Sequence, residues 1–308
     1  MGRILGLALA VLVFAAGGLA VYVWTGLHDF DVEELTSDVH LISGWGGNVA
    51  VLRTGAGAVV VDTMTFRMQG QEIRELAEDL GGGPVTAIVN THYHRDHTHG
   101  NPGFAPGTRV VATERTLEHL RTRDAAYWEG EAALTLPSDT FSDTHELRVG
   151  DKTVRSLHLG RGHTDGDLVT LFVEDRVLVT GDLLSRFRYP NIDLEAGGSV
   201  REWIGTLDRV AELDFDRVIP GHGPSTDRAG IRAFQDFLRE LWQAASESAA
   251  AGLSLDETLS QTKLTTDAGY HAIGVPFVFR LDRDFVVRRA FEEATGAAGG
   301  AADGAGAP

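Results

Sequence analysis

The stretch Thr91-His92-Tyr93-His94-Arg95-Asp96-His97 decides the fold of this chain, because it places three imidazoles and one carboxylate within six residues. Imidazole nitrogen and carboxylate oxygen are ligands for Zn²⁺ and also for iron and manganese. A short loop can direct neighbouring side chains to different ions, so we expect His92 and His94 to face one metal ion, and Asp96 and His97 a second. A solvated polar loop or a histidine-rich metal scavenger would also explain this stretch alone.

Three more candidate ligands follow apolar strands elsewhere in the chain. Gly162-His163 offers a third ligand for the first ion, and Pro220-Gly221-His222 completes the set of the second. Gly181-Asp182 ends the apolar run 177–180, and its carboxylate could bridge both ions. Each of these residues taken alone is more often structural. Together they favour one site, because active sites of α/β proteins gather where strands of a rigid sheet end.

This combination resembles the metallo-β-lactamase superfamily, whose mark is a His-x-His-x-Asp-His loop followed by Gly-His, Gly-Asp and a late Gly-His. The pieces here are Asp62, the loop 92–97, His163, Asp182 and His222, within residues 36 to 225. The resemblance implies an α/β fold, an αββα sandwich with two divalent metal ions at one edge, with Zn²⁺ favoured and Fe or Mn as alternatives. It also implies that Asp62 holds the ligand loop by hydrogen bonds. The alternative role of Asp62 is to cap a strand-to-helix turn.

The metals suggest the chemistry. Two cations ~3.5–4 Å apart lower the pKa of a bridging water, and the resulting hydroxide can attack an electrophilic carbonyl. Asp96 or Asp182 could accept the proton and return it to the leaving group. The sequence therefore predicts a metallo-hydrolase that cleaves a small-molecule ester, thioester or lactone. The aspartate at position 182 resembles the glyoxalase II type of site, whereas the zinc β-lactamases carry Cys or Ser there.

Other functions stay open, since this scaffold hosts many reactions. One is β-lactam hydrolysis. Another is a redox reaction of the persulfide dioxygenase kind, which uses the same ligand loop with one iron; flavin-linked di-iron relatives have Glu in the place of His94. Nucleic acid is not an expected partner, because 44 acidic against 27 basic residues give a net charge of −17, which repels polyanions. A non-catalytic metal-binding protein is the remaining class.

Three residues outside the ligand set are weaker candidates for contacts with the small-molecule substrate. Trp45 lies in the glycine-rich hairpin turn 44–47, where it could cover the substrate or pack on its own hairpin. Arg186 and Arg188 follow Asp182 and could hold a substrate carboxylate, although arginines more often face solvent.

The N-terminal segment, residues 1–27, is expected to be a membrane anchor or a signal segment. Residues 4–24 form an uncharged, mostly apolar run, long enough to cross a ~30 Å hydrocarbon core as a helix. Arg3 before the run and four acidic residues in 29–34 after it favour a catalytic part outside the cytoplasm. A cleaved signal peptide, with a secreted or periplasmic protein, is the alternative because Gly18-Leu19-Ala20 is a weak cleavage site. A buried core helix is the third reading.

The rest of the chain divides into three expected parts. Residues 28–225 form the catalytic core, and residues 226–295 form a C-terminal helical part packed on it. Apolar residues at helical spacing from Ile231 to Trp242 predict the first of these helices, and Ser254 with Glu257 predicts a capping box on the next. The tail 296–308 is rich in Gly and Ala and is expected to be disordered. The sequence gives no indication of an oligomeric state.

Overall fold

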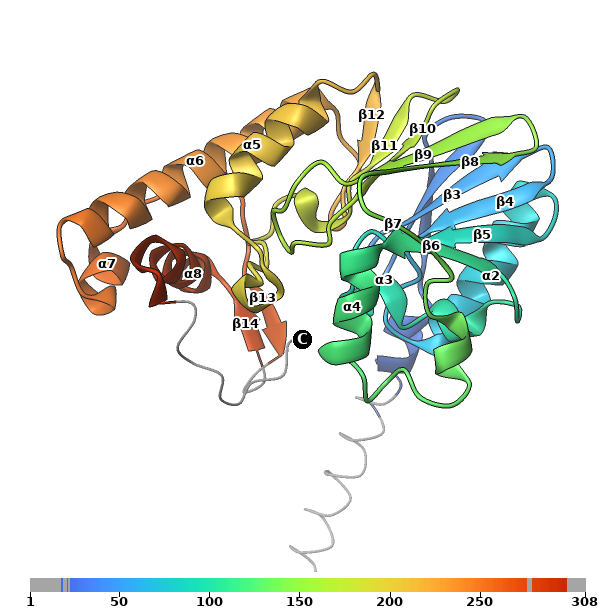
Figure 1. Ribbon diagram of the computed structural model, residues 1–308, viewed down its shortest axis with the longest axis horizontal. Helices are drawn as coiled ribbons and strands as arrows, with labels where there is room; N and C mark the ends of the chain where they lie inside the picture. Colours follow the sequence, from blue (N-terminus) through green and yellow to red (C-terminus); the bar gives the residue numbers. More distant parts are fainter. Residues whose placement is uncertain (1–17, 19–20, 22, 276–278, 298–308) are drawn as a thin grey trace, which may run out of the picture.

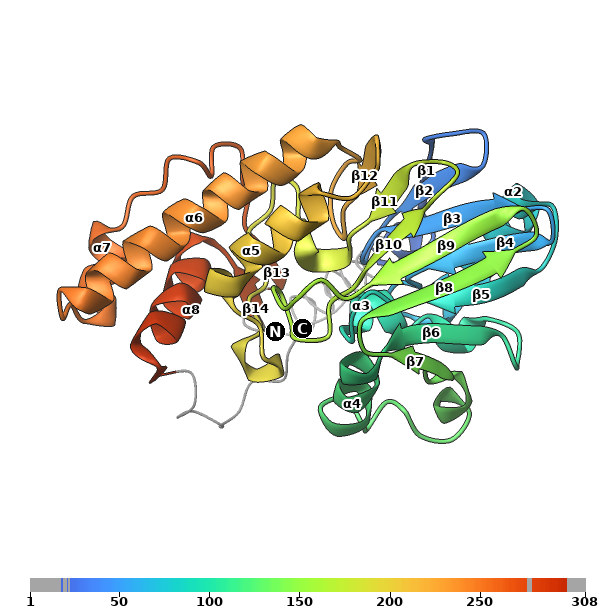
Figure 2. The same ribbon diagram turned by 45° about the horizontal axis from the view of Figure 1, so that its top comes forward.

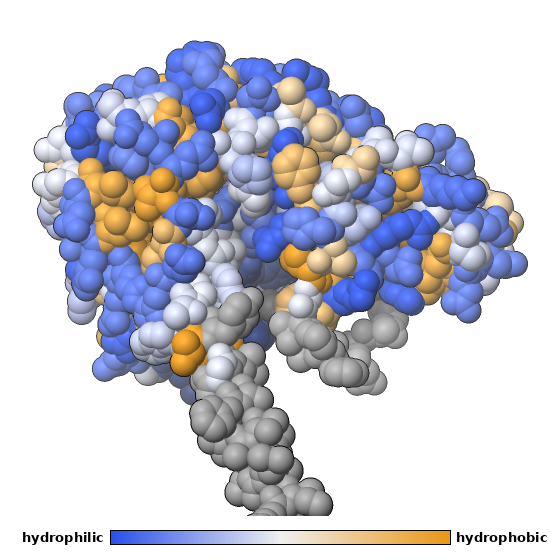
Figure 3. Space-filling view, turned by 180° about the vertical axis from the view of Figure 1, so that it is seen from behind, coloured by the Kyte–Doolittle hydropathy of each residue, from blue (hydrophilic) through white to orange (hydrophobic). Residues whose placement is uncertain are grey.

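A computed structural model describes residues 18, 21, 23–275 and 279–297 of the chain. Two large β-sheets pack face to face, and helices cover the outer face of each sheet (Figures 1 and 2). This αββα sandwich confirms the predicted fold. The face of the molecule in Figure 3 is largely hydrophilic.

The first sheet has seven strands in sequence order. They are β1 (Asp31–Glu34), β2 (Val39–Ser43), β3 (Val49–Thr54), β4 (Gly57–Val61), β5 (Val85–Val89), β6 (Arg109–Thr113) and β7 (Asp139–Phe141). Neighbours from β1 to β4 are antiparallel, and those from β4 to β7 are parallel. Because parallel neighbours need a crossover, α2 (Arg67–Gly81) connects β4 to β5 and α4 (Glu114–Thr122) connects β6 to β7.

The second sheet has five strands in the order β12-β11-β10-β9-β8. They are β8 (Thr144–Val149), β9 (Lys152–Leu157), β10 (Val169–Phe172), β11 (Val177–Val179) and β12 (Arg217–Ile219). The helix α5 (Val200–Ala211), which the sequence did not predict, connects the parallel strands β11 and β12. Short helical turns complete the core, namely α3 (Arg95–Thr98), η1 (Asn101–Gly103), η2 (Ala132–Thr135), η3 (Gly181–Leu183) and η4 (Leu194–Ala196).

The C-terminal part contains α6 (Arg228–Ala250), α7 (Leu255–Gln261), the hairpin of β13 (Ile273–Val275) and β14 (Phe279–Leu281), and α8 (Arg283–Thr295). The predicted capping box is present at the start of α7, where Ser254 and Glu257 bond to each other's backbone N–H groups. Figure 1 shows α5, α6 and α8 together on one side of the molecule, with the hairpin between them and the core. The hairpin was not predicted.

Strand alternation explains why both sheets are buried on two faces. In β4, Val59 and Val61 belong to the core between the sheets. Their neighbours Ala58 and Val60 face the opposite way and pack with Ile73 of α2. A strand covered on both faces is apolar throughout instead of alternating with polar residues. The sandwich is therefore rigid, and the loops at its edge can hold side chains in fixed positions.

Most of the predicted anchor, residues 4–24, lies outside the described residues, as does the tail from residue 298. Within the part of the chain that the structure describes, we find no helix that combines the length and apolar character needed to cross a bilayer. The helix α8 ends at Gly296, which adopts the left-handed conformation with φ 72°, as a helix-terminating glycine commonly does.

Candidate metal centre

The histidine loop splits its side chains between two directions because it runs from strand β5 into the short helix α3. His94 is the N-cap of α3 and has an extended backbone, with φ −62° and ψ 151°. His92 precedes it in the loop, whereas Asp96 and His97 lie within the first turn of α3. An extended residue followed by a helical turn changes the direction in which successive side chains point. The side chains of the loop can therefore act as ligands at two neighbouring metal positions.

The structure brings all seven sequence-predicted ligands together in two adjoining groups. The first contains His92, His94, His163 and Asp182, and the second contains Asp96, His97 and His222. Within each group the candidate ligand atoms lie within 4.8 Å of one another. They come from four loops at one edge of the sandwich, which follow β5, β9, β11 and β12.

Asp182 lies between the two groups. Its Oδ1 is 3.2 Å from Nε2 of His97 and 3.4 Å from Nε2 of His222. Its Oδ2 faces the first group and is 3.7 Å from Nε2 of His163. The two oxygens of one carboxylate thus point to different groups, which is the geometry that a bridging ligand requires.

Several inward-facing atoms of the cluster lack the partners that buried polar atoms normally have. Nε2 of His92, Nε2 of His97 and Oδ1 of Asp182 are buried and make no hydrogen bond to any residue that the structure describes. Such atoms are rare in proteins unless a water or an ion satisfies them. Nδ1 of His94 and Nε2 of His163 also point at each other, 2.8 Å apart. These nitrogen and oxygen donors are able to hold divalent metal ions.

The surroundings of the first group lower the pKa values of two of its histidines. Burial, and then the charge of His97, lowers the pKa of His92 well below its usual value. Burial and the charge of His94 lower the pKa of His163 to about 4. Both imidazoles are therefore neutral near pH 7, and the neutral form is the one that binds a metal ion.

In the second group, the pKa of a histidine is raised instead of lowered. Burial would lower the pKa of His97, but the carboxylates of Asp96 and Asp182 outweigh burial and raise it well above its usual value. Burial would raise the pKa of Asp182, but His222 and His97 hold it well below its usual value. A proton on His97 therefore takes the place that a cation would fill between these carboxylates.

Asp62 makes the contacts that the loop-holding role requires. Its carboxylate accepts hydrogen bonds from the backbone N–H and the hydroxyl of Thr91, at 2.8 and 2.7 Å. Its Oδ2 also lies 2.7 Å from Nδ1 of His97, which leaves Nε2 of that ring facing the cluster. Asp62 has a positive φ of 64°, a strained conformation for a residue other than glycine that persists only where the surroundings enforce it.

Sequence reasoning missed Asp193, which orients another candidate ligand. Its Oδ2 lies 3.0 Å from Nε2 of His94 and accepts a hydrogen bond from the hydroxyl of Tyr93 at 2.5 Å. Nδ1 of His94 is thereby directed into the cluster. Asp193 is 99 residues away from His94 in the chain, so no local pattern indicates this pair.

We predict that Asp193→Asn weakens metal binding at the first group by about 10- to 100-fold, the usual effect of losing the partner of a ligand histidine. The amide cannot accept hydrogen bonds at every position where the carboxylate does, so the ring of His94 becomes less well oriented. Zinc competition with a chromogenic chelator measures the change. The matched control is Asp139→Asn, which alters a contact of the same 3.0 Å length to His145 outside the cluster. Equal zinc affinity in the two variants would contradict this role.

Two glycines let the backbone approach the cluster closely. A Cβ on Gly47 would lie 2.5 Å from Cε1 of His97, and one on Gly221 would collide with Oδ1 of Asp182. The backbone around the metal centre therefore has no room for side chains at these two positions.

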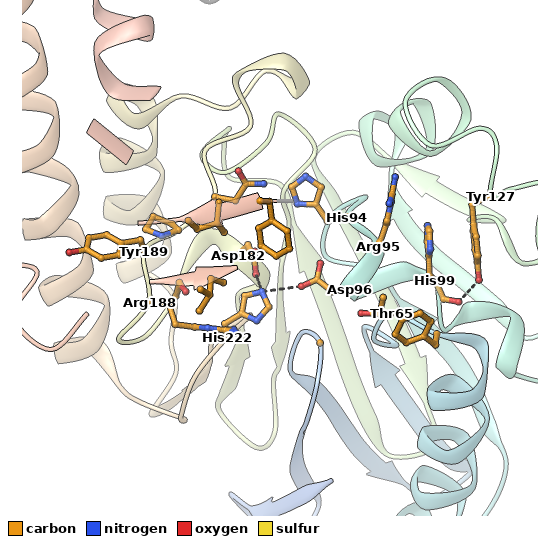
Figure 4. A pocket seen from close by; sticks show the side chains of 18 of the residues that line it. Thr65, His94, Arg95, Asp96, His99, Tyr127, Asp182, Arg188, Tyr189 and His222 are labelled. Atoms are coloured by element: carbon orange, nitrogen blue, oxygen red, sulfur yellow. Dashed lines mark hydrogen bonds and ion pairs between the residues drawn. The ribbon is translucent and has the colours of Figure 1, made fainter. Parts of the chain in front are cut away.

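A cavity of about 770 Å³, which we call the main pocket, opens on the ligand cluster. Figure 4 shows His94, Asp96, Asp182 and His222 in its middle, with Arg188 and Tyr189 on one side. Thr65, His99 and Tyr127 lie on the other side. Of the three weaker candidates, Arg188 lines the main pocket. Trp45 and Arg186 line only a neighbouring cavity of about 640 Å³, to whose wall Arg188 also contributes.

Comparison with known proteins places this fold and site in one class, the metal-dependent hydrolases. A family model described as the metallo-beta-lactamase superfamily matches residues 42–222. The chain is 23% identical over 262 residues to the linear primary-alkylsulfatase of Pseudomonas sp. (strain ATCC 19151), covering 70% of this chain and 49% of that protein. It is 25% identical to the metallo-beta-lactamase type 2 of Bacillus sp. (strain 170), covering 62% and 72%.

A solved structure, the stereoselective inverting sec-alkylsulfatase Pisa1 from Pseudomonas sp., matches with a TM-score of 0.68 and 17% identity, covering 85% of this chain and 50% of that one. The chain thus spans about half the length of both alkylsulfatases. Since the family model covers more than half of the chain, the protein belongs to the metallo-beta-lactamase superfamily and is a metallo-hydrolase.

Proposed function

We propose that this protein hydrolyses a small-molecule ester, thioester or lactone at a centre of two divalent metal ions, with Zn²⁺ as the expected ion. The observation that carries the proposal is the opening of the main pocket directly onto the ligand cluster, in which buried atoms of His92, His97 and Asp182 make no hydrogen bond to any described residue. When bound, the two ions would supply an activated water and a Lewis acid for the reacting carbonyl.

The chain's own residues divide the remaining tasks. The first group and the second group would each hold one ion, and Asp182 has one carboxylate oxygen facing each group. Asp96 lies at the wall of the main pocket. Burial would raise the pKa of Asp96, but His97 and His222 lower it far below its usual value. Asp96 is therefore ionised near pH 7, as a metal ligand must be, and we assign to its carboxylate the transfer of a proton from the nucleophilic water to the leaving group.

Three arginines line the main pocket, and two of them, Arg67 and Arg95, are ion-paired with Glu131 and Asp124. Arg188 is the third. Its guanidinium makes no hydrogen bond or ion pair with any residue in the described part of the chain, and the charges of Asp182 and Asp96 act on it through the pocket. An arginine without a carboxylate partner can form paired hydrogen bonds with a carboxylate or another oxyanion. We infer that it holds an anionic group of the substrate.

We predict that Arg188→Ala lowers kcat/KM by about 10- to 100-fold for anionic substrates, the usual effect of losing a hydrogen bond to a charged group. The kcat/KM for neutral substrates should change little. The matched control is Arg186→Ala, because Arg186 lies outside the main pocket and stacks on Phe187. Steady-state kinetics on a neutral and a carboxylate-bearing ester of the same leaving group make the comparison. An equal loss on both esters would argue against an anion-holding role.

Sulfate-ester hydrolysis is a second candidate, favoured by the unpaired Arg188 beside the metal centre. A sulfate ester presents an oxyanion next to the bond that breaks, so one arginine could hold it there. The likeness to a linear primary-alkylsulfatase supports this candidate.

One panel of substrates separates these functions. The full chain, loaded with zinc, is assayed on an ester, a thioester, a lactone, an alkyl sulfate and a chromogenic cephalosporin. We expect the highest kcat/KM on one of the first three. A preference for the sulfate would select the second candidate, and a preference for the cephalosporin would indicate a β-lactamase. Oxygen uptake with a persulfide by the iron-loaded protein, without hydrolysis of the panel, would replace the proposal with a dioxygenase.

We further propose that the protein acts outside the cytoplasm, held at the membrane by its N-terminal segment or exported after cleavage of that segment. The support is the sequence alone, in which Arg3 precedes the apolar run 4–24 and acidic residues follow it. Fractionation of cells expressing the full chain tests this. Recovery from the cytosol with an intact N-terminus would contradict both versions.

A further inference from the structure

We propose that Ile273, Phe279 and Leu281 of the strands β13 and β14, together with Phe66, form an apolar subsite that takes the hydrocarbon chain of the substrate. This proposal rests on the proposed function and narrows its substrate class to amphipathic molecules. Their reacting group lies over the metal centre, and an acyl or alkyl chain extends along the main pocket.

The first observation is the composition of the pocket away from the cluster. Ile273, Phe279 and Leu281 of the hairpin line the main pocket, and so does Phe66 from the start of α2. None of these side chains carries a polar atom. In Figure 4 the strands of the hairpin lie on the side of Arg188, while Thr65, the neighbour of Phe66, lies on the opposite side. Apolar side chains from two separate segments of the chain, the strands β13 and β14 and the start of α2, therefore line the main pocket.

The second observation is the position of Phe66 itself. Phe66 is the N-cap of α2, where Ser, Thr, Asp and Asn are strongly preferred because their side chains accept a hydrogen bond from the helix. The side chain of Gln69 bonds to the backbone N–H of Phe66 instead, at 3.2 Å. Phe66 as a whole remains 47% exposed. A residue that breaks a local rule without a structural gain points to function.

The third observation is where charge occurs in the main pocket. Of the three arginines that line it, Arg67 and Arg95 are ion-paired with Glu131 and Asp124, and Arg188 is not. Ile273 and Phe279 offer hydrocarbon only. An anionic or polarised head is attracted to the centre, and a chain attached to it gains free energy by leaving water for the apolar walls. A short hydrophilic substrate would leave this surface wet.

Calorimetry with carboxylate probes tests the subsite without any turnover. Butyrate and octanoate are titrated into the zinc-loaded full chain. We expect octanoate to bind at least about tenfold more tightly than butyrate, since a pocket gains this much from added methylenes. Phe279→Ala and Phe66→Ala should each remove much of this ratio, while butyrate affinity changes little. The matched control is Phe187→Ala, an aromatic residue with 43% exposure that lies outside the main pocket.

The kinetic readout uses a series of nitrophenyl esters with acyl chains of increasing length. The proposal expects KM to fall with chain length in the wild type and not in Phe279→Ala. Equal affinity for butyrate and octanoate, or an unchanged ratio in both variants, overturns the subsite. Chain-dependent binding without hydrolysis of any ester leaves the subsite standing and refutes the proposed function. Hydrolysis of esters without any preference for chain length supports the proposed function and refutes the subsite.

Discussion

Asp182→Ala is expected to lose one of two bound metal ions and to lower kcat/KM by at least about 100-fold, because a lost metal interaction removes several kcal/mol of transition-state stabilisation. Among the residues that the structure describes, Asp182 is the single carboxylate in contact with both groups, through Oδ1 to His97 and His222 and through Oδ2 to His163. Its removal leaves the first group with three histidines and the second without its shared oxygen. Elemental analysis and steady-state kinetics on the same preparation measure both effects.

The matched control for Asp182 is Asp143→Ala, which removes an exposed carboxylate between β7 and β8. It should keep two ions and full turnover. Circular dichroism should show both variants folded, since the side chain of Asp182 stabilises the cluster and not the sandwich core. Two ions and unchanged turnover in Asp182→Ala would refute the bridging role.

Removal of the metal ions is expected to abolish hydrolysis and to lower Tm by about 10 °C. Ions present at about 1,000 times their Kd stabilise the folded state by about 4 kcal/mol, and 1 kcal/mol shifts Tm by about 2–4 °C in a domain of this size. The physical reason lies in the buried atoms of His92, His97 and Asp182 that make no hydrogen bond to any described residue. Thermal unfolding before and after dialysis against a chelator measures the shift. Readdition of zinc should restore both Tm and turnover, and a Tm unaffected by chelation would contradict a metal centre here.

The stabilisation of the folded protein by bound metal ions should become smaller as the pH falls. In the metal-free protein, Asp96 and Asp182 raise the pKa of His97 against the opposing effect of burial. A raised pKa contributes stability that is fully present below the unfolded value of about 6.5 and is lost as the pH rises through the folded value. Metal ions displace this proton, so the Tm values of the zinc-loaded and metal-free protein should converge in acid. If the Tm difference between zinc-loaded and metal-free protein stays constant as the pH is lowered, protons and metal ions do not compete for this site.

The sequence by itself determined the family, the sandwich fold and the list of candidate ligands. The loop 92–97 is local, and the chemistry of its side chains can be read without coordinates. His163, Asp182 and His222 could be added because each follows an apolar strand, and strand ends converge at the edge of a sheet. Asp62 was predicted from the resemblance, and the structure gives it hydrogen bonds to Thr91 and His97.

Only the tertiary structure decided what surrounds the ligands. The contact between Asp193 and His94 joins residues 99 positions apart. The hairpin that lines the main pocket is separated from Asp182 in the chain by the helices α5, α6 and α7. The choice of Arg188 over Arg186 and Trp45 likewise depends on which cavity each side chain lines. Ligand types follow from local chemistry, whereas pocket walls and the partners of ligands depend on long-range packing, which leaves no periodic signal in the sequence.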